Sequence, residues 1–188
     1  KSFHDLNEAF TAWYYKFHPV ESTRYGIADN NGGFISISVE QNEEYIADVS
    51  RFIIELSQID PTKLSSRDRI DYEILASKLE EMKYFMSEIR PWEWNPSWIL
   101  REIYDGLFLI SESQDIDMQH RVDTVKKRVN LIPDILKKSK LLISSYSKSH
   151  FEYGELIIES IIKLLDDLPL KINSDNITLD EIDMLIAE

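Results

Sequence analysis

Apolar side chains recur at spacings of three and four residues along most of this 188-residue chain. That period places them on one face of an α-helix, and amphipathic helices bury such faces by packing against one another. Only the Phe34–Ile37 segment suggests an extended conformation, and no clear strand partner lies near it in the sequence. We therefore predict an all-α fold, an irregular bundle of about six to eight helices with at most a minor extended segment near residues 33–37.

Prolines and capping residues divide this pattern into separate helices. The first is expected to begin at Phe3 and to be closed by Pro19, with residues 18–37 as a connection. Pro133 either kinks a helix or opens a second one, and Pro169 is expected to stop another. Capping boxes, in which Ser or Thr precedes Glu or Gln by three residues, mark later helix starts at Ser38 with Gln41, Ser149 with Glu152 and Thr178 with Glu181.

Two of the predicted helices carry further expectations. A helix of more than twenty residues should start near Ser65 and run to the proline at position 91. Its apolar face is predicted to hold Ile70, Ile74, Met82, Phe85 and Ile89. The segment from Phe151 to Leu168 is so rich in Ile and Leu that we expect it to be the most buried helix.

The stretch from Arg90 to Trp98 separates two of these helices near the middle of the chain. Pro91 disfavours helix at Arg90, whereas Pro96 suits the first position of a new helix with Asn95 as its N-cap. We name the candidate structural or recognition residues here the aromatic corner: Trp92, Trp94, Asn95, Pro96, Trp98 and Tyr104. Its aromatic rings either plug a junction between packed helices, which we favour, or form an exposed surface that recognises peptides or carbohydrates.

Composition excludes several classes of function. The chain has no cysteine, which rules out disulfides and thiolate-bound zinc. Its formal charge of -13 argues against nucleic acid and against an anionic membrane surface as partners. No apolar run approaches the roughly 18 residues that a membrane span requires, so we predict no membrane span.

No arrangement of residues predicts catalysis or cofactor binding. The four histidines, His4, His18, His120 and His150, have no second His or Cys at helical spacing, and one His with one carboxylate is too few ligands for zinc. Phosphate-binding, dinucleotide-binding and nucleophile-elbow glycine motifs are absent from the sequence. We therefore assign no catalytic, cofactor-binding or metal-binding residue in residues 1–188.

The order of several short motifs resembles the N-terminal region of the bacterial domain-of-unknown-function 885 family, whose members are grouped with gluzincin-type zinc metallopeptidases. The motifs occur in this order: His18-Pro19, Ser22-Thr23-Arg24-Tyr25-Gly26-Ile27, Leu64-Ser65-Ser66-Arg67-Asp68-Arg69-Ile70-Asp71-Tyr72, Asn95-Pro96-Ser97-Trp98, Arg128-Val129-Asn130-Leu131-Ile132-Pro133 and the helix after His150.

This resemblance implies that the zinc ligands and the general base belong to a His-Glu-x-x-His-type helix in a downstream part of the parent protein. The present chain contains no His-Glu dipeptide, so no catalytic residue is carried over to it. The resemblance also implies an extracytoplasmic location, which the sequence itself leaves unknown. We further expect residues 1–188 to be a single helical domain at the N-terminus of a larger protein, because the last predicted helix is too short to be stable alone. The alternative is that this segment is a short C-terminal helix docked on the bundle.

Two hypotheses about function follow. The first is a non-catalytic N-terminal lobe of a zinc metallopeptidase-like protein, whose partners are the downstream catalytic portion of the same polypeptide and a peptide substrate. In that case zinc is needed only in the downstream part, and this chain itself needs no cofactor. The second is a self-contained helical binding module that uses the aromatic corner from Trp92 to Tyr104 to hold a peptide or a carbohydrate.

Overall fold

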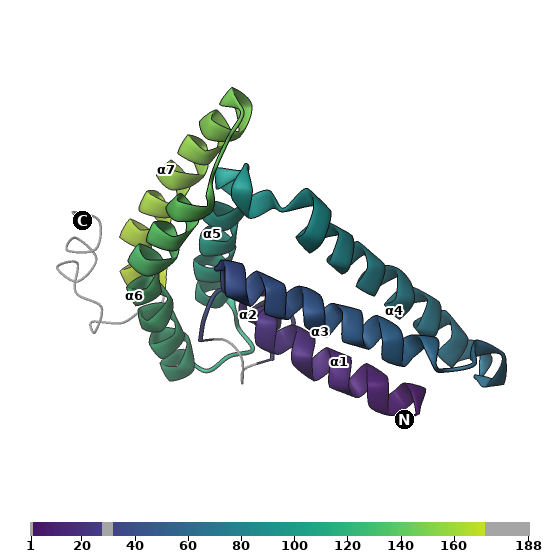
Figure 1. Cartoon of the computed structure of the whole chain (residues 1–188). Helices are drawn as coiled ribbons and strands as arrows, with labels where there is room; N and C mark the ends of the chain where they lie inside the picture. The colour runs from purple at the N-terminus through teal and green to yellow at the C-terminus, as the bar shows by residue number, and fades with distance from the viewer. Residues whose placement is uncertain (1, 28–31, 172–188) are drawn as a thin grey trace. The chain divides into compact units, whose positions relative to one another are not determined.

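The chain is all-α, as the sequence predicts. The computed structural model describes residues 2–27 and 32–171, and in these ranges it contains seven α-helices and no β-strand (Figure 1). The helices are α1 (Phe3–Phe17), α2 (Pro19–Arg24), α3 (Val39–Ser57), α4 (Ser66–Tyr84), α5 (Pro96–Glu112), α6 (Met118–Leu142) and α7 (Lys148–Lys171). The capping box predicted at Thr178 and Glu181, and the helix predicted after it, lie outside the described residues.

Contacts between Cα atoms group the chain into two compact units. Unit 1 comprises Lys1–Tyr14 and Ser38–Pro91, and unit 2 comprises Tyr15–Ile37 and Trp92–Glu188. The single domain predicted for residues 1–188, as the N-terminal portion of a larger protein, stays a prediction.

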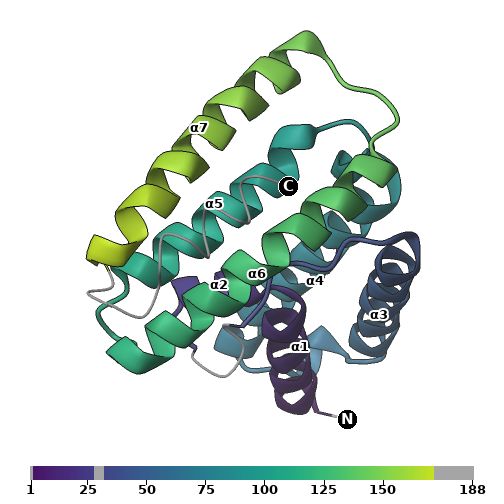
Figure 2. The ribbon, with the colours of Figure 1, turned by 90° about the vertical axis from the view of Figure 1, so that its left-hand side faces the viewer.

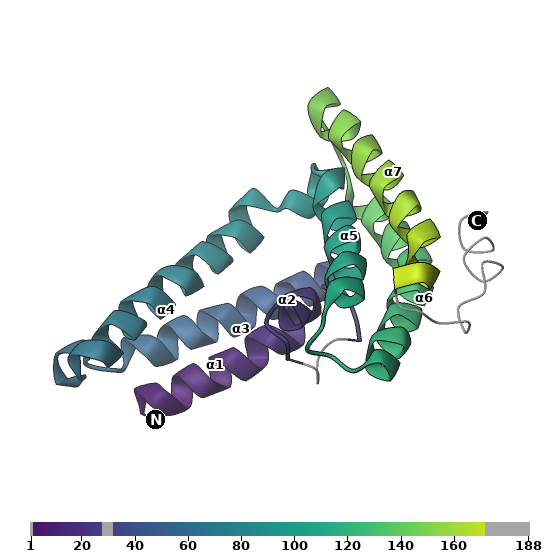
Figure 3. The same cartoon turned by 180° about the vertical axis from the view of Figure 1, so that it is seen from behind.

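Unit 1 is held together by aromatic contacts of α1 with α3 and by packing between α3 and α4. Figure 3 shows the course of these three helices. Phe10 and Trp13 of α1 meet Phe52 of α3 at ring-centroid distances of 5.5 and 5.3 Å. Trp13 also donates a 2.7 Å hydrogen bond from its indole nitrogen to Asp48. The aromatic spacing seen in the sequence of α1 therefore forms a packed face, and the one polar atom of Trp13 is satisfied at its edge.

Unit 2 is built around α5. This helix packs against α2, α6 and α7, and α6 and α7 flank it along its length (Figure 2). Ile103, Leu107 and Ile110 of α5 are completely buried, each being 0% exposed. Residues 33–37 have no regular secondary structure, yet Phe34, Ile35 and Ile37 are buried in the same unit. The minor extended segment allowed by the sequence is thus a buried loop.

Pro19 starts a helix instead of only closing one. Residues 19–24 form α2, a segment that the sequence analysis treated as connection. The fixed φ of proline suits the first helical position. The tertiary structure then stabilises this short helix, because Val20, Ser22 and Thr23 are buried.

The apolar face predicted for α4 was only partly right. Ile70 and Ile74 are 59% and 62% exposed, whereas Met82 is buried. The other buried side chains are Leu75, Leu79 and Met86. The sequence of α4 offers apolar residues on more than one side, and neighbouring elements decide which side is covered. The helix proper ends at Tyr84 and a five-residue π-helical turn, Phe85–Ile89, leads to Arg90.

The two ends of α7 differ from the prediction. Ser147 caps the helix, because its hydroxyl accepts a 3.3 Å hydrogen bond from the backbone N–H of His150, so Ser149 lies inside α7 and is not the cap. Pro169 does not stop the helix, which continues to Lys171. The missing N–H of a proline costs only one hydrogen bond in the last turn, and the complete burial of Leu168 stabilises this turn.

Two further expectations are resolved by α6 and α7. A single helix runs through Pro133, so no second helix opens there. The prediction that Phe151–Leu168 is the most buried helix is wrong, because α7 exposes Phe151, Leu156 and Ile158 at 47%, 59% and 45%. Helix α5 is more buried because three helices, α2, α6 and α7, pack against it, whereas the main packing partner of α7 is α5.

Candidate functional site

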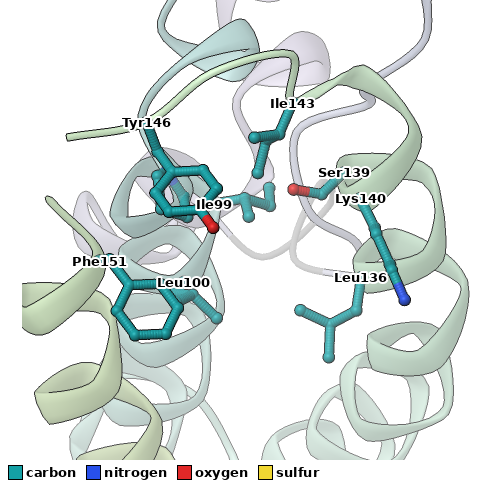
Figure 4. Close-up of a pocket in the computed structure, with 9 residues that line it drawn as sticks. Ile99, Leu100, Leu136, Ser139, Lys140, Ile143, Tyr146 and Phe151 are labelled. Carbon is teal, nitrogen blue, oxygen red and sulfur yellow. The ribbon is translucent and has the colours of Figure 1, made fainter. Parts of the chain in front are cut away.

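An open pocket lies in unit 2 where the start of α5, the C-terminal half of α6 and the start of α7 come together (Figure 4). Its volume is about 420 Å³, which is within the usual range of roughly 300–1,000 Å³ for small-ligand sites. Its lining is mostly apolar and consists of Pro96, Ile99, Leu100, Leu136, Ser139, Lys140, Ile143, Tyr146 and Phe151.

Capping interactions fix the elements that line this pocket. The side-chain oxygen of Asn95 accepts hydrogen bonds from the backbone N–H of Ser97 at 3.1 Å and from its hydroxyl at 2.6 Å. Asn95 is thereby the N-cap of α5 and Pro96 its first residue, as the sequence predicts. This cap sets the direction in which Ile99 and Leu100 leave the first turns of α5.

The connection from α6 to α7 is anchored to the residues just before α5. The carbonyl oxygen of Glu93 accepts hydrogen bonds from the backbone N–H groups of Ser144 and Ser145, at 2.8 and 3.2 Å. Trp94 makes an edge-on contact with the His150 ring at a centroid distance of 5.0 Å. These contacts hold the connection over one end of the pocket.

Three polar groups line the otherwise apolar pocket. The hydroxyl groups of Ser139 and Tyr146 point into it in Figure 4, and Lys140 follows Ser139 on α6. The Tyr146 ring is held by stacking on Phe151, with ring centroids 5.7 Å apart. The pocket therefore combines apolar walls with two hydroxyls and one ammonium, a composition that suits binding of an amphipathic ligand.

The residues of the aromatic corner do not share one environment. Trp92 is 5% exposed, whereas Trp94, Trp98 and Tyr104 are half-buried. Trp98 packs near Trp92 with centroids 6.2 Å apart, and Tyr104 stacks on Phe108 at 5.8 Å. Both Trp98 and Tyr104 also pack against the hydrophobic core of unit 2. Only Pro96 of the corner lines the pocket, so the corner and the pocket are neighbours that share one residue.

A buried arginine joins four segments of unit 2. The Arg128 side chain is fully buried and donates hydrogen bonds to the carbonyl oxygens of Gly33, Gly106 and Pro19. It also donates a 2.8 Å hydrogen bond to the hydroxyl of Thr23. Burial lowers the pKa of Arg128 to about 10 and Glu102 opposes this, so the side chain remains charged at neutral pH. We name this set of contacts the Arg128 clamp.

Glu102 of α5 binds the same loop two residues further along, at Ile35. Its carboxylate accepts a 3.0 Å hydrogen bond from the backbone N–H of Ile35. Burial raises the pKa of Glu102 to about 7, although the Ile35 bond and the charge of Arg128 both lower it. Desolvation therefore outweighs the attraction between Glu102 and Arg128, whose side chains are not in direct ionic contact among the interactions of the described residues.

The sequence alone did not predict the functional roles of these polar groups, for different reasons. Arg128 lies between Val125 and Val129, which are both buried. A charged residue inside an apolar stripe is the sequence pattern that could have indicated its burial. Lys140, Tyr146 and Phe151 gave no signal, because they meet only when the α6–α7 connection folds back toward α5. The histidines are not brought together, and no group of three or more potential ligands from His, Cys, Asp and Glu gathers in residues 2–27 and 32–171.

None of the helices in the described part of the chain is both long and apolar enough to cross a membrane. No protein-family model and no curated protein sequence matches this chain. A solved structure with a similar fold is described as "a putative lipoprotein of unknown function" from Shewanella oneidensis. It aligns with a TM-score of 0.83 and 21% sequence identity over 100% of this chain and 34% of the other. The chain thus spans about a third of that structure's length, and at this identity the similarity concerns the fold alone.

Proposed function

We propose that this chain is a non-catalytic helical lobe of a larger, zinc metallopeptidase-like protein. In this proposal it braces a catalytic portion that follows in the same polypeptide and forms one wall of its substrate cleft. The main observation in support is that the whole chain aligns with only about a third of a longer protein of similar fold. The motif order that resembles the domain-of-unknown-function 885 family supplies the identity of the catalytic portion, its zinc and the extracytoplasmic location.

The pocket supports the wall function. A cleft wall has to hold part of a peptide without taking part in bond cleavage, and an open apolar pocket with a few polar groups suits that task. The pocket in unit 2 offers apolar side chains from α5, α6 and α7 together with the polar groups of Ser139, Lys140 and Tyr146. Under this proposal a peptide substrate is the ligand and the following catalytic portion is the intramolecular partner.

Comparison of the 188-residue chain with the polypeptide encoded by its full reading frame tests this proposal. Zinc content is measured by elemental analysis, and hydrolysis is measured on a mixture of unstructured peptides. We expect zinc and hydrolysis in the longer polypeptide alone, with both lost when the first His of its His-Glu-x-x-His motif is replaced by Ala. Stoichiometric zinc in the 188-residue chain, or a full reading frame without such a motif, would refute the proposal.

The second candidate function is a self-contained module for peptide or carbohydrate recognition. The observation that favours it is the position of the aromatic corner beside the pocket, with Trp94 in contact with His150, the neighbour of Phe151. Half-buried Trp94 and Trp98 should then change fluorescence when a ligand binds. Titration of the chain and of a Trp94→Phe variant with peptides and oligosaccharides measures this change. Emission that no ligand alters would count against this function.

A further inference from the structure

The pocket has walls that fit an apolar side chain. Ile99 and Leu100 of α5 face Leu136 of α6, and Ile143 and Phe151 complete the apolar lining (Figure 4). The exposed fractions of Leu136 and Phe151 are 39% and 47%, so a ligand can reach both side chains. Covering this apolar surface with an aliphatic or aromatic group would remove it from water, which is the main source of favourable binding free energy here.

Lys140 supplies a positive charge to the pocket lining, and no ion pair joins it to another of the described residues. Two nearby lysines are paired, Lys138 with Asp134 at 2.8 Å and Lys148 with Glu152 at 3.4 Å, whereas Lys137 resembles Lys140 in forming no ion pair with the described residues but lies outside the pocket lining. No carboxylate of residues 2–27 or 32–171 lies within 4.0 Å of the Lys140 ammonium, whereas the whole chain carries a formal charge of -13. The net negative charge of the protein repels an anionic ligand, whereas the Lys140 ammonium attracts its anionic group at the pocket.

The hydroxyls indicate that the ligand also carries an amide. Ser139 is 7% exposed, and its hydroxyl points into the pocket without a hydrogen-bond partner among the described residues. A hydrocarbon ligand would cover this hydroxyl and leave it unsatisfied, which is unfavourable. A peptide N–H or C=O would satisfy it, and the Tyr146 hydroxyl offers a second site for the same purpose.

We propose that the pocket binds the C-terminal residue of a peptide, with its apolar side chain between α5 and α6 and its free carboxylate paired with Lys140. The backbone amide of that residue bonds to Ser139 or Tyr146. This inference rests on the proposed function, because both take a peptide as the ligand. It adds that the pocket recognises the free C-terminus of that peptide and the apolar side chain of its last residue.

Matched peptides test the carboxylate directly. Acetyl-glycyl-glycyl-leucine and acetyl-glycyl-glycyl-phenylalanine are titrated into the whole 188-residue chain, each as the free acid and as the C-terminal amide, by isothermal calorimetry. An ion pair at an exposed lysine is worth about 1 kcal/mol, so we expect the free acids to bind about fivefold more tightly than the amides. The corresponding peptide ending in aspartate should bind more weakly than either, because its side chain is charged. Equal affinity of acids and amides, or no binding of any peptide, would overturn the proposal.

Two matched variants identify the residue that provides the charge. Lys140→Met is expected to remove the preference for free acids, whereas Lys137→Met, which changes an exposed lysine outside the pocket lining, should keep it. Leu136→Glu places a carboxylate in the wall and should weaken the free acids more than the amides. Circular dichroism confirms that each exposed-site variant is folded. An unchanged preference in Lys140→Met would overturn the assignment of that lysine.

The same titration separates this inference from its alternatives. Decanoate carries a carboxylate and an apolar chain but no amide, so tighter binding of decanoate than of the peptides would identify an acyl chain as the occupant and overturn the proposal. Peptide binding needs no zinc. If the chain binds these peptides but its full reading frame lacks a zinc motif, the proposed function is refuted and the pocket assignment stands. If the longer polypeptide shows zinc-dependent hydrolysis but the pocket binds no peptide, only the pocket assignment is refuted.

Discussion

Arg128 and Thr23 are 105 positions apart in the sequence, and their side chains are joined by a buried hydrogen bond of 2.8 Å. The same guanidinium also bonds to the carbonyl oxygens of Pro19, Gly33 and Gly106. Arg128 thus fixes α2 and the loop after it onto α5 and α6. A single side chain donates to four acceptors in a part of the protein that is closed to water, and one of them, the Pro19 carbonyl, also accepts from the Thr23 hydroxyl at 3.1 Å.

Replacement of Arg128 by Met should destabilise unit 2 strongly. Methionine fills much of the volume but donates no hydrogen bond, so four buried hydrogen bonds from a charged donor are lost and the free energy of unfolding falls by about 3–5 kcal/mol. Arg128→Lys should recover only part of this loss, because an ammonium cannot reach four separated acceptors. Urea denaturation followed by circular dichroism measures both. The control is Arg101→Met at an exposed position of α5, and a loss for Arg128→Met no larger than for this control would contradict the clamp.

Glu102 should make the protein less stable as the pH rises through neutrality. Its folded-state pKa is raised from 4.5 to about 7, so the folded protein binds more protons than the unfolded chain between these values. The stabilisation is complete below pH 4.5 and is lost as the pH rises through 7, by an amount on the order of 3 kcal/mol.

The variant Glu102→Gln isolates this effect, because Gln keeps the oxygen that accepts from Ile35 but does not ionise. Its free energy of unfolding should equal that of the unmodified protein near pH 4 and exceed it near pH 8. Denaturation at both pH values checks this, and the titration of the other ionisable groups largely cancels because both proteins contain them. A difference between the two proteins that does not change with pH would show that Glu102 titrates normally.

Gly106 and Gly154 should respond oppositely to alanine. A Cβ atom at Gly106 would lie 2.6 Å from the Phe34 ring and 3.1 Å from Val20, so Gly106→Ala should cost about 1–3 kcal/mol through overpacking. A Cβ at Gly154 meets only Leu100, at an ordinary 3.4 Å, so Gly154→Ala should stabilise α7 by up to about 1 kcal/mol. Thermal unfolding of the two variants measures these signs. Stabilisation by both would mean that Phe34 is not packed tightly on α5.

Loss of the α5 cap should be measurable but moderate. Asn95→Ala removes the acceptor for both the backbone N–H and the hydroxyl of Ser97, and should lower the free energy of unfolding by about 1 kcal/mol. Asn95→Asp keeps a capping oxygen and should be close to the unmodified protein. Urea denaturation of the pair checks this. Equal losses in the two variants would show that the change at position 95 acts through something other than the cap.

Local rules of the sequence predicted much of the helical organisation. Asn95 and Pro96 start α5, and Ser38 caps α3 by accepting from the N–H of Gln41 at 3.1 Å, because these interactions involve residues only two or three positions apart. The start of α7 was misplaced by two residues because Ser147 and Ser149 offer equivalent hydroxyls. The end at Pro169 was wrong because burial of Leu168 stabilises a turn that proline disfavours.

The lining of the candidate pocket could not be predicted from these local rules. Asn95 and Pro96 of the aromatic corner start α5 as predicted, but the tryptophans of the corner do not line the pocket beside it. The pocket lining comes from residues 96–100, 136–146 and 151, whose meeting depends on how α6 and α7 pack around α5. Trp92 is 5% exposed, as expected for a ring that fills a junction between helices. The role of the aromatic corner in recognition stays a prediction.

The sequence by itself determined that this chain is helical and where most helices begin, because periodic burial and capping act over a few neighbouring residues. Only the tertiary structure decided which apolar faces are covered, as the exposed Ile70 and the fully buried Ile103 show. It also decided that Arg128 is enclosed by distant carbonyl groups and that Lys140 stands beside an apolar pocket. Both arrangements depend on contacts between segments far apart in the chain, and spacing along one helix carries no information about its partners.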